Sequence, residues 1–476
     1  MNRIVGLETE YGCLAADDPG VAAAIARVRD WIFHDQRFGL IDVHQRDWDE
    51  PAGNGGFLFN GGRCYIDMGH LEYCTPECLS LMDVLRHDQA GDAMLLQAVQ
   101  ALGVEDKVSF IRNNVDHYSG ATFGCHENYL VRRTAPLTEP NLHSLLAFLT
   151  LRMLYTSAGR VGASTGAEGR GEWPRTSAGG SFQISQRADY INNDLFEWVQ
   201  FNRAIINTRD EPLADARKYR RLHLLHGDTN VLPATLLLKV GTTSLVLDLL
   251  ELNCLPKIML DDAVAAFRQI SHQADGPWLV RIADGRCVDA VLLLQQFQRA
   301  ARAELAGRDS ETDHLLALWE ETLAALAAHP PSLAGRVDWI TKRWLLQKFC
   351  DQEKISWSDP WLKSQDLEYH QIDPRRSLGL ALARTPPPWQ LSSQEATLAI
   401  SQPPPDTRAA VRSRVMRLLQ NEPCSYYLDW EIVGVEGGHA LHLLNPFDPN
   451  PKEADKWMQL FTQPFARFSQ PSRRTP

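Results

Sequence analysis

The sequence predicts an α+β fold. Strand and helix patterns are mixed along the chain without the regular strand–helix alternation of a doubly wound fold, which favours one sheet with separate helices. Strand-like segments occupy residues 3–7, 57–73, 108–111, 121–130 and 182–185, and helical segments occupy 15–33, 80–102, 142–157, 232–252 and 290–328. Two triple-proline runs between residues 385 and 408 mark a boundary. We therefore expect a large domain over 1–400 and a small C-terminal domain over 401–476.

The first two strands turn acidic side chains to one face. The apolar run at 3–7 leads into Glu8 and Glu10, which lie two residues apart and so project from the same side of the strand. We expect this strand to end at these carboxylates. Apolar and polar residues alternate within 57–73, so a strand there turns Arg63, Tyr65 and Asp67 to a common face.

The other elements follow from periodicity and from glycine. The first helix is indicated by the apolar residues Val21, Ala24, Ile25, Val28 and Ile32. Residues 47–56 and 159–180 are rich in glycine and polar side chains, and we interpret both as loops. In the C-terminal domain we expect a helix over 409–421 and a β-hairpin over 426–444 that turns at residues 436–438.

Composition excludes several classes of protein. The chain has 476 residues, and with 44% hydrophobic and 22% charged residues it falls in the range of globular proteins that bury a sizeable core. A formal charge of -11 argues against coating nucleic acid, which needs clustered lysine and arginine. The nine cysteines form no CxxC pair, so neither a disulfide framework nor a zinc knuckle is expected. Without a signal-peptide core or a membrane span in the sequence, we expect a cytoplasmic protein that acts on a protein or a small molecule.

Acidic residues at two strands predict a metal site. Glu8 and Glu10 come from the first strand, and Asp67 and Glu72 come from the second. Clustered carboxylates repel one another unless a cation lies between them, and Mg²⁺ is the natural choice for oxygen ligands. A single carboxylate of this kind is more often solvated or paired with a cation, but Arg63 and Tyr65 beside the acids favour a functional site.

Two further polar clusters leave alternatives open. In the segment GCHENYL, His126 and Asn128 share one face of a strand, and His126 is either a metal ligand or a buried core histidine. Residues 206–223 alternate acidic and basic side chains and contain Arg209, Arg221 and His223. Such a run is either an exposed lattice of ion pairs or a clamp for a polyphosphate. The sequence has no Walker motif and no dinucleotide fingerprint, so a nucleotide would bind in another kind of site.

Several long motifs resemble one known family. They are GLETEYG, NGGRCYIDMGHLEY, NNVDHYSGATFGCHENYL, ISQRADY, INTRDEPLADARKYRRLH, GDTNV with LKVGTTSLVL, and VDWITKR. The chain resembles the Pup ligases and Pup deamidase/depupylases, which are carboxylate-amine ligases of glutamine-synthetase-like fold. The resemblance implies a concave antiparallel sheet backed by helices, with a small C-terminal domain that completes the nucleotide site.

The resemblance also implies roles for individual residues. Glu8, Tyr65 and Glu72 match metal ligands for Mg²⁺, and His126 and His223 are further candidates in the metal shell. Arg63 and Thr75 match contacts to ATP, and Trp430 matches a tryptophan that packs on the nucleotide. Arg209 and Arg221 are candidate phosphate contacts. Asp67 matches the catalytic aspartate. The implied partners are a small disordered Pup-like protein modifier and lysine-bearing protein substrates, and we expect neither nucleic acid nor membrane.

The two branches of the family run opposite reactions. Ligases phosphorylate the side-chain carboxylate of the modifier's C-terminal Glu and pass it to a lysine, whereas depupylases hydrolyse a C-terminal Gln amide or the isopeptide. Cys125 and the Asp429–Trp430 pair resemble the ligases, and FQISQRAD resembles the depupylases. We expect a ligase, with the depupylase as the alternative. A small-molecule γ-glutamyl ligase and an inactive regulatory paralogue are more distant alternatives. Leu71, at a position where both branches usually carry proline, leaves room for a diverged modifier.

Overall fold

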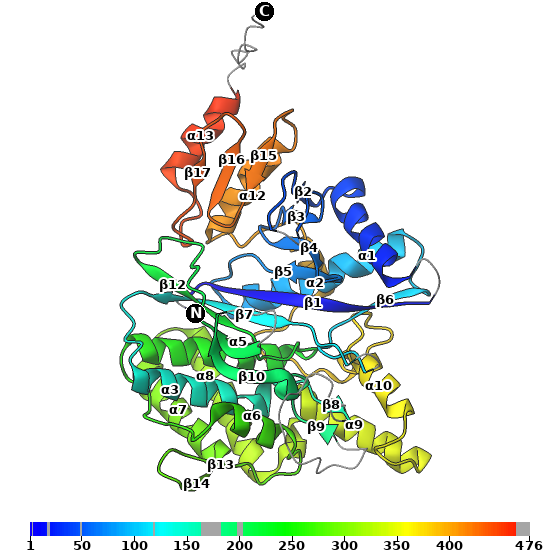
Figure 1. Cartoon of the computed structure of the whole chain (residues 1–476), viewed down its shortest axis with the longest axis vertical. Helices are drawn as coiled ribbons and strands as arrows, with labels where there is room; N and C mark the ends of the chain where they lie inside the picture. The colour runs from blue at the N-terminus through cyan, green and yellow to red at the C-terminus, as the bar shows by residue number, and fades with distance from the viewer. Residues whose placement is uncertain are drawn as a thin grey trace, which may run out of the picture.

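A ten-stranded sheet runs through the middle of the molecule (Figure 1). The computed structural model describes residues 1, 3–16, 20–47, 50–117, 120–162, 182–197 and 203–462. Most of the loop expected at 159–180 lies outside them.

The strands of the sheet follow one another in an order that differs from their order in the sequence. In spatial order they are β10 (Ile191–Phe196), β11 (Arg203–Asn207), β12 (Tyr219–Leu224), β7 (Cys125–Arg132), β1 (Val5–Ala15), β5 (His70–Cys74), β4 (Arg63–Asp67), β3 (Gly55–Leu58) and β2 (Gly39–Ile41). Strand β6 (Val108–Ile111) pairs with the far half of β1. The α+β prediction is confirmed. The sheet is mixed, because β10 and β11 are parallel.

Strand β1 is longer than expected. It continues past Glu8 and Glu10 to Ala15, because Gly12 to Ala15 pair with β6. The prediction that the strand ends at its carboxylates is therefore wrong. Val5, Leu7 and Tyr11 point to the buried side of the sheet, which places Glu8 and Glu10 together on the opposite face.

The predicted single strand over 57–73 is three strands, β3, β4 and β5. The turn between β4 and β5 consists of Met68 (φ 45°) and Gly69 (φ 92°). Two-residue hairpin loops favour positive φ at both positions, usually with Asn-Gly or Asp-Gly. Met-Gly lacks that signature, so periodicity alone did not reveal the turn. The expected common face of Arg63, Tyr65 and Asp67 holds within β4.

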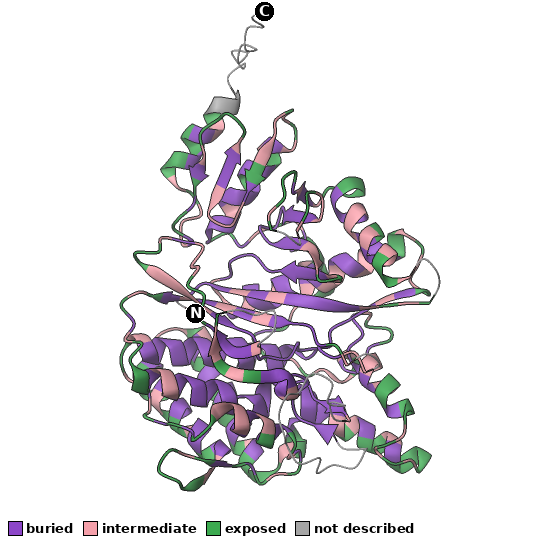
Figure 2. Cartoon of the chain, in the orientation of Figure 1, coloured by how far each residue is buried: buried purple, intermediate pink, exposed green. Residues whose placement is uncertain are grey.

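Helices cover one side of the sheet. They are α2 (Leu81–Ala101), α3 (Glu139–Leu151), α4 (Met153–Thr156), α5 (Pro233–Glu251), α6 (Ala263–Ser271), α7 (Ala290–Leu305), α8 (Ser310–Ala328), α9 (Asp338–Glu353), α10 (Trp361–Tyr369) and α11 (Ser393–Leu398). The short strands β8 (Arg160–Val161), β9 (Phe182–Gln183), β13 (Leu279–Arg281) and β14 (Cys287–Asp289) lie among them. Helix α1 (Val21–Asp30) continues into one π-helical turn (Trp31–Asp35). Figure 2 shows the burial of this layer.

Helix α5 forms the centre of the helical layer. Every residue from Pro233 to Leu250 is buried. By length and composition alone this helix would also suit a membrane span, but its apolar window is wholly buried inside the fold, as in the core helix of a globular protein.

A smaller unit follows at the C-terminus. Helices α12 (Arg408–Leu419) and α13 (Lys452–Thr462) pack with strands β15 (Tyr426–Leu428), β16 (Ile432–Val435) and β17 (Leu441–His442). The expected hairpin is thus a three-stranded meander, because a second turn lies at 429–431. The core of this unit includes Leu40 and Phe57 from the large sheet, and Phe59, which follows β3. The division at residue 400 stays a prediction.

Candidate active site

The register of five neighbouring strands gathers polar side chains on one face of the sheet. Glu8 of β1 is paired with His126 of β7 and with Cys74 of β5, and Glu10 is paired with Glu72. Residues paired across a ladder point to the same face. By the same register this face carries Asn128, His223 and Arg221 on one side, and Glu72, Tyr65, Arg63 and Asp67 on the other.

Glu8, His126 and His223 form the first cluster. The Oε2 atom of Glu8 lies 2.9 Å from Nδ1 of His126 and 3.5 Å from Nε2 of His223. Asn128 donates its Nδ2–H to the other carboxylate oxygen at 2.8 Å. Burial disfavours the charged form of Glu8, but His223 and His126 outweigh it, and the pKa of Glu8 lies well below its ordinary value.

Burial lowers the pKa of His223 to about 4, against the attraction of Glu8. An ionised carboxylate therefore faces a neutral imidazole at neutral pH. Nε2 of His223 is buried and has no hydrogen-bond partner among the described residues. These donors fit a divalent cation, and their ligand atoms all lie within 4.8 Å of one another.

Glu10, Asp67 and Glu72 form the second cluster. Their carboxylates also bring one oxygen each within 4.8 Å of the others. Burial, and then the charges of Glu8 and Glu10, raise the pKa of Glu72 well above its ordinary value. Three carboxylates this close need a proton or a cation between them, and an all-oxygen set suits Mg²⁺. The structure thus separates Glu72 from the Glu8 cluster and groups it with Asp67 and Glu10, an acid that the ligand set implied by the resemblance does not include.

Tyr65 and Arg63 lie at the edge of the acids. The Arg63 guanidinium is stacked 4.1 Å from the centroid of the Tyr65 ring. It also donates to Glu50 at 2.6 Å and to Asp42 at 3.0 Å. Burial, and then the charge of Glu72, raise the pKa of Tyr65 well above its ordinary value. The phenol is therefore protonated unless a cation displaces the proton.

Trp430 reaches this part of the site from the C-terminal unit. Its ring packs edge-on against Phe57 at 5.1 Å, and Arg412 lies 5.1 Å from its centroid. Phe57 is paired with Arg63, so Trp430 approaches the same corner of the sheet. Thr75 is buried, and its hydroxyl accepts the Leu7 N–H at 3.0 Å. Its own hydroxyl proton is left to donate.

The two candidate phosphate contacts differ in position. Arg221 lies on the site face, where it donates to Asn128 at 3.4 Å, and its buried Nε has no partner within the described part of the chain. Arg209 is largely exposed and pairs with Glu211 at 2.6 Å. Because Glu211 also lies 3.6 Å from Arg221, this end of the segment does form a small lattice of ion pairs.

The sequence reasoning missed Arg187. This side chain is 2% exposed, donates to the Phe123 carbonyl at 2.5 Å, and has a buried Nε without a partner among the described residues. Burial and the charge of Arg203 lower its pKa to about 10, although Glu10 opposes the shift. A buried cation beside an acid cluster suits an anionic group of a substrate. The available sequence signal was its place in ISQRADY, one of the motifs that carry the family resemblance.

Carboxylates, imidazoles and arginines on one open sheet face provide metal ligands beside cationic contacts for phosphate. Together with the mixed sheet, the helical backing and the small C-terminal sheet, they match what the motif resemblance implies, a carboxylate-amine ligase of glutamine-synthetase-like fold.

Comparison with known proteins identifies the family. The family model for "Pup-ligase protein" matches residues 3–434. A depupylase of Acidothermus cellulolyticus is 33% identical over 487 residues, covering 94% of each chain. A Pup–protein ligase of Micrococcus luteus is 34% identical over 474 residues, covering 95% of this chain and 97% of that one. The chain belongs to the Pup-ligase family.

Solved structures agree with this assignment. The complex between prokaryotic ubiquitin-like protein Pup and its ligase PafA matches with a TM-score of 0.81 and 30% identity, over 97% of this chain and 92% of that one. The Pup ligase PafA in complex with ADP matches with a TM-score of 0.77 and 30% identity, over 91% and 93%. The fold class implied by the motifs is confirmed.

Proposed function

We propose that this protein is an ATP- and Mg²⁺-dependent ligase that joins the C-terminal Glu side-chain carboxylate of a Pup-like modifier to lysines of protein substrates. The observation that carries the proposal is the pair of adjacent clusters, Glu8–His126–His223 and Glu10–Asp67–Glu72, on one face of the sheet. The ligase names of relatives near 34% identity and the ADP and Pup complexes of PafA support it.

The reaction has two steps. An oxygen of the modifier's Glu carboxylate attacks the γ-phosphorus of ATP, which forms an acyl phosphate and releases ADP. The lysine nitrogen then attacks the carbonyl carbon, phosphate leaves, and an isopeptide bond forms. When bound, Mg²⁺ would supply positive charge that stabilises the negative charge on the phosphate oxygens. The residues divide between the two clusters: Glu8, His126 and His223 would hold one ion, and Glu72 and Glu10, with Tyr65 beside them, would hold another.

We propose Asp67 as the general base. A lysine side chain is protonated near neutral pH and must lose a proton before it attacks. Asp67 is the last residue of β4, at the hairpin turn, and its side chain is only partly buried. An incoming lysine therefore has access to this carboxylate. Arg63, Arg221, Thr75 and Trp430 would bind ATP, with Arg209 at the rim, and residues 401–476 would complete the nucleotide site.

The second candidate function is depupylation. The Acidothermus relative with that name matches almost the full chain. There the same Asp67 would attack the carbonyl or activate water, and the nucleotide would act as a cofactor. For either function we propose a cytoplasmic enzyme with a small disordered Pup-like modifier as partner, acting on neither nucleic acid nor membranes.

One experiment separates these functions. Purified enzyme is incubated with ATP, Mg²⁺, a lysine-bearing acceptor and a Pup protein that ends in either Glu or Gln, and the masses are recorded. A conjugate from the Glu form with one ADP per bond supports the ligase. Loss of ammonia from the Gln form, or release of Pup from a conjugate without matching ATP consumption, supports the depupylase and contradicts the ligase.

A further inference from the structure

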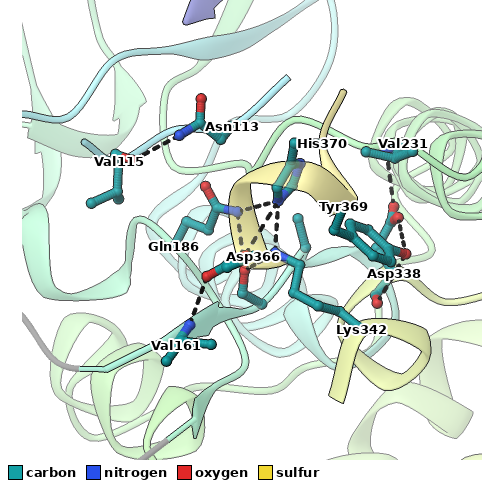
Figure 3. A network of polar contacts seen from close by, with 12 residues as sticks. Asn113, Val115, Val161, Gln186, Val231, Asp338, Lys342, Asp366, Tyr369 and His370 are labelled. Atoms are coloured by element: carbon teal, nitrogen blue, oxygen red, sulfur yellow. Dashed lines mark hydrogen bonds and ion pairs between the residues drawn. The ribbon is translucent and has the colours of Figure 1, made fainter. Parts of the chain in front are cut away.

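A buried polar network lies between helices α9 and α10 and the sheet (Figure 3). Lys342, Asp366 and His370 are each at most 1% exposed. Nζ of Lys342 donates to Asp366 at 2.5 Å and to the Gly159 carbonyl at 2.6 Å. Asp366 also accepts the Val161 N–H at 2.7 Å. A buried ion pair is not in itself a source of stability, so its role in the fold requires another explanation.

His370 has a defined protonation state. Its Nε2 accepts from Lys342 Nζ at 2.6 Å and from Gln186 Nε2 at 2.8 Å. Burial and the charge of Lys342 hold the pKa of His370 well below its ordinary value. The imidazole is therefore neutral. Because two N–H donors face Nε2, we assign its proton to Nδ1, which is buried and has no hydrogen-bond partner among the described residues. Because His370 can only accept at Nε2, it fixes which end of the Gln186 amide faces it.

The orientation of the Gln186 amide determines which of its atoms faces Asn114. The Gln186 amide group also donates to the Gly159 carbonyl at 3.0 Å, so Oε1 is turned the other way and accepts the Asn114 N–H at 2.6 Å. Asn114 in turn donates Nδ2–H to the Phe123 carbonyl at 3.1 Å and accepts the Phe123 N–H on its own carbonyl at 3.2 Å. A continuous chain of hydrogen bonds thus joins Lys342 to Phe123.

Phe123 and Gly124 lie against the acid cluster. The Phe123 ring stacks on the His70 ring at 4.5 Å and 26°. His70 is paired with Asp67 across the β4–β5 hairpin. The Gly124 carbonyl accepts the Glu10 N–H at 3.3 Å, and a Cβ atom at Gly124 would lie 2.6 Å from Glu10 Oε1. No spare room separates this segment from the carboxylates, so a displacement of the segment displaces them.

We propose that Lys342, His370 and Gln186 are positioning residues, which place the Phe123–Gly124 segment and through it the Glu10–Asp67 side of the site. This inference rests on the proposed function. The nucleotide side is held separately, since Arg63 is bound by Asp42 and Glu50 and Trp430 packs on Phe57. Disturbing the network should therefore affect the transfer step more than ATP binding.

The test compares three variants in steady-state ligation. Gln186→Met removes the hydrogen bonds and keeps the length of the side chain. Its kcat should fall about tenfold or more, because misplacement by 1 Å costs on the order of 100-fold, while KM for ATP stays within about twofold. His370→Phe should lower kcat and leave KM for ATP unchanged to the same extent as Gln186→Met. His370→Gln restores an acceptor oxygen and should retain at least about half of the wild-type kcat.

Gln298→Met is the matched control. Gln298 is also a buried glutamine, 4% exposed, but it contacts Leu316 within the helical layer. Its kcat should equal that of the wild type. Hydrogen exchange gives a readout independent of turnover: amides of 121–126 should exchange faster in Gln186→Met, and those of β3 (55–58), on the nucleotide side, should not change.

A folded Gln186→Met variant with wild-type kcat and wild-type exchange at 121–126 overturns the inference. A parallel loss of kcat, ATP affinity and protection across the whole sheet also overturns it, because that pattern means general destabilisation. If the wild type forms no conjugate, the proposed function fails, and the exchange comparison still decides whether the network places the segment.

Discussion

Glu10 on β1 and Glu72 on β5 lie directly opposite each other in the antiparallel ladder, and both side chains are buried. Like charges facing each other across a ladder destabilise a sheet. Asp67 adds a third carboxylate oxygen within 4.8 Å of theirs. The fold accepts this arrangement because a cation or a proton can occupy the space between the oxygens. Metal binding and the position of Asp67, the proposed general base, are therefore coupled.

Replacing Asp67 by Asn should abolish turnover but not nucleotide binding. The amide keeps the shape of the carboxylate and loses its capacity to accept the lysine proton. A general base contributes about 10²–10⁴-fold, so kcat should fall by at least about 100-fold while ATP affinity stays near that of the wild type. Asp284→Asn, at the exposed turn between β13 and β14, is the control. An active Asp67→Asn enzyme would remove Asp67 from the mechanism.

Replacing Glu8 by Ala should weaken Mg²⁺-dependent ATP binding. Glu8 is held by His126 and Asn128 at the centre of the first cluster. Even groups that only orient metal ligands change metal affinity by about 10–100-fold, so the loss should be at least of this size. Calorimetric ATP titrations at low and high Mg²⁺ measure it, with the exposed Glu139→Ala as control. Unchanged affinity at both concentrations would mean that the metal site is misassigned.

The packing of the small C-terminal unit against the rest of the protein should depend on Glu77. This buried residue accepts from Arg408 at 2.6 Å and from Arg412 at 2.5 Å. Burial disfavours its charge, but Arg412 and Arg408 outweigh it and lower the pKa of Glu77 to about 2. The contribution of ionised Glu77 to the free energy of unfolding is thus present at neutral pH, and it is lost as the pH falls from about 4.3 toward 2.

Glu77→Gln should cost about 3–5 kcal/mol in the free energy of unfolding, because it leaves buried guanidinium groups without a counter-charge. Denaturant unfolding at pH 7 measures this cost. Glu320→Gln is the control, since Glu320 is largely exposed and its pair with Arg302 should contribute at most about 1 kcal/mol. Equal effects of the two substitutions would contradict the assignment.

Acid sensitivity should be traceable to His87 on α2. This residue is 1% exposed, and burial lowers its pKa to about 3. The unfolded chain binds the proton more readily below pH about 6.5, so stability is present above that pH and is lost on acidification. His87 should contribute about 1.4 kcal/mol per pH unit to the slope of the free energy of unfolding against pH. Other buried histidines, among them His223 and His370, contribute to the profile in the same direction, so His87→Leu should make it shallower by about this amount between about pH 6.5 and 4. The exposed His34→Leu should leave the profile unchanged.

Local periodicity accounts for the parts of the site that were predicted. Glu8 and Glu10 share a face, Arg63, Tyr65 and Asp67 share a face, and His126 and Asn128 lie opposite Glu127, as the alternation in each strand indicated. The turn at Met68–Gly69, the extension of β1 and the third strand of the C-terminal meander were missed, because each depends on pairing with another segment.

By itself, the sequence determined the α+β class, the order of the elements, the family resemblance and the facing of each polar side chain, since these follow from backbone geometry and from long contiguous motifs. Only the tertiary structure decided that Glu8 meets His126 and His223 while Glu72 meets Glu10 and Asp67. It also decided that the buried Arg187 has no hydrogen-bond partner at its Nε among the described residues, and that Glu77 binds Arg412. These contacts join segments far apart in the chain. Their partners are set by strand register and by the exclusion of water from the interior, neither of which is encoded in a local pattern.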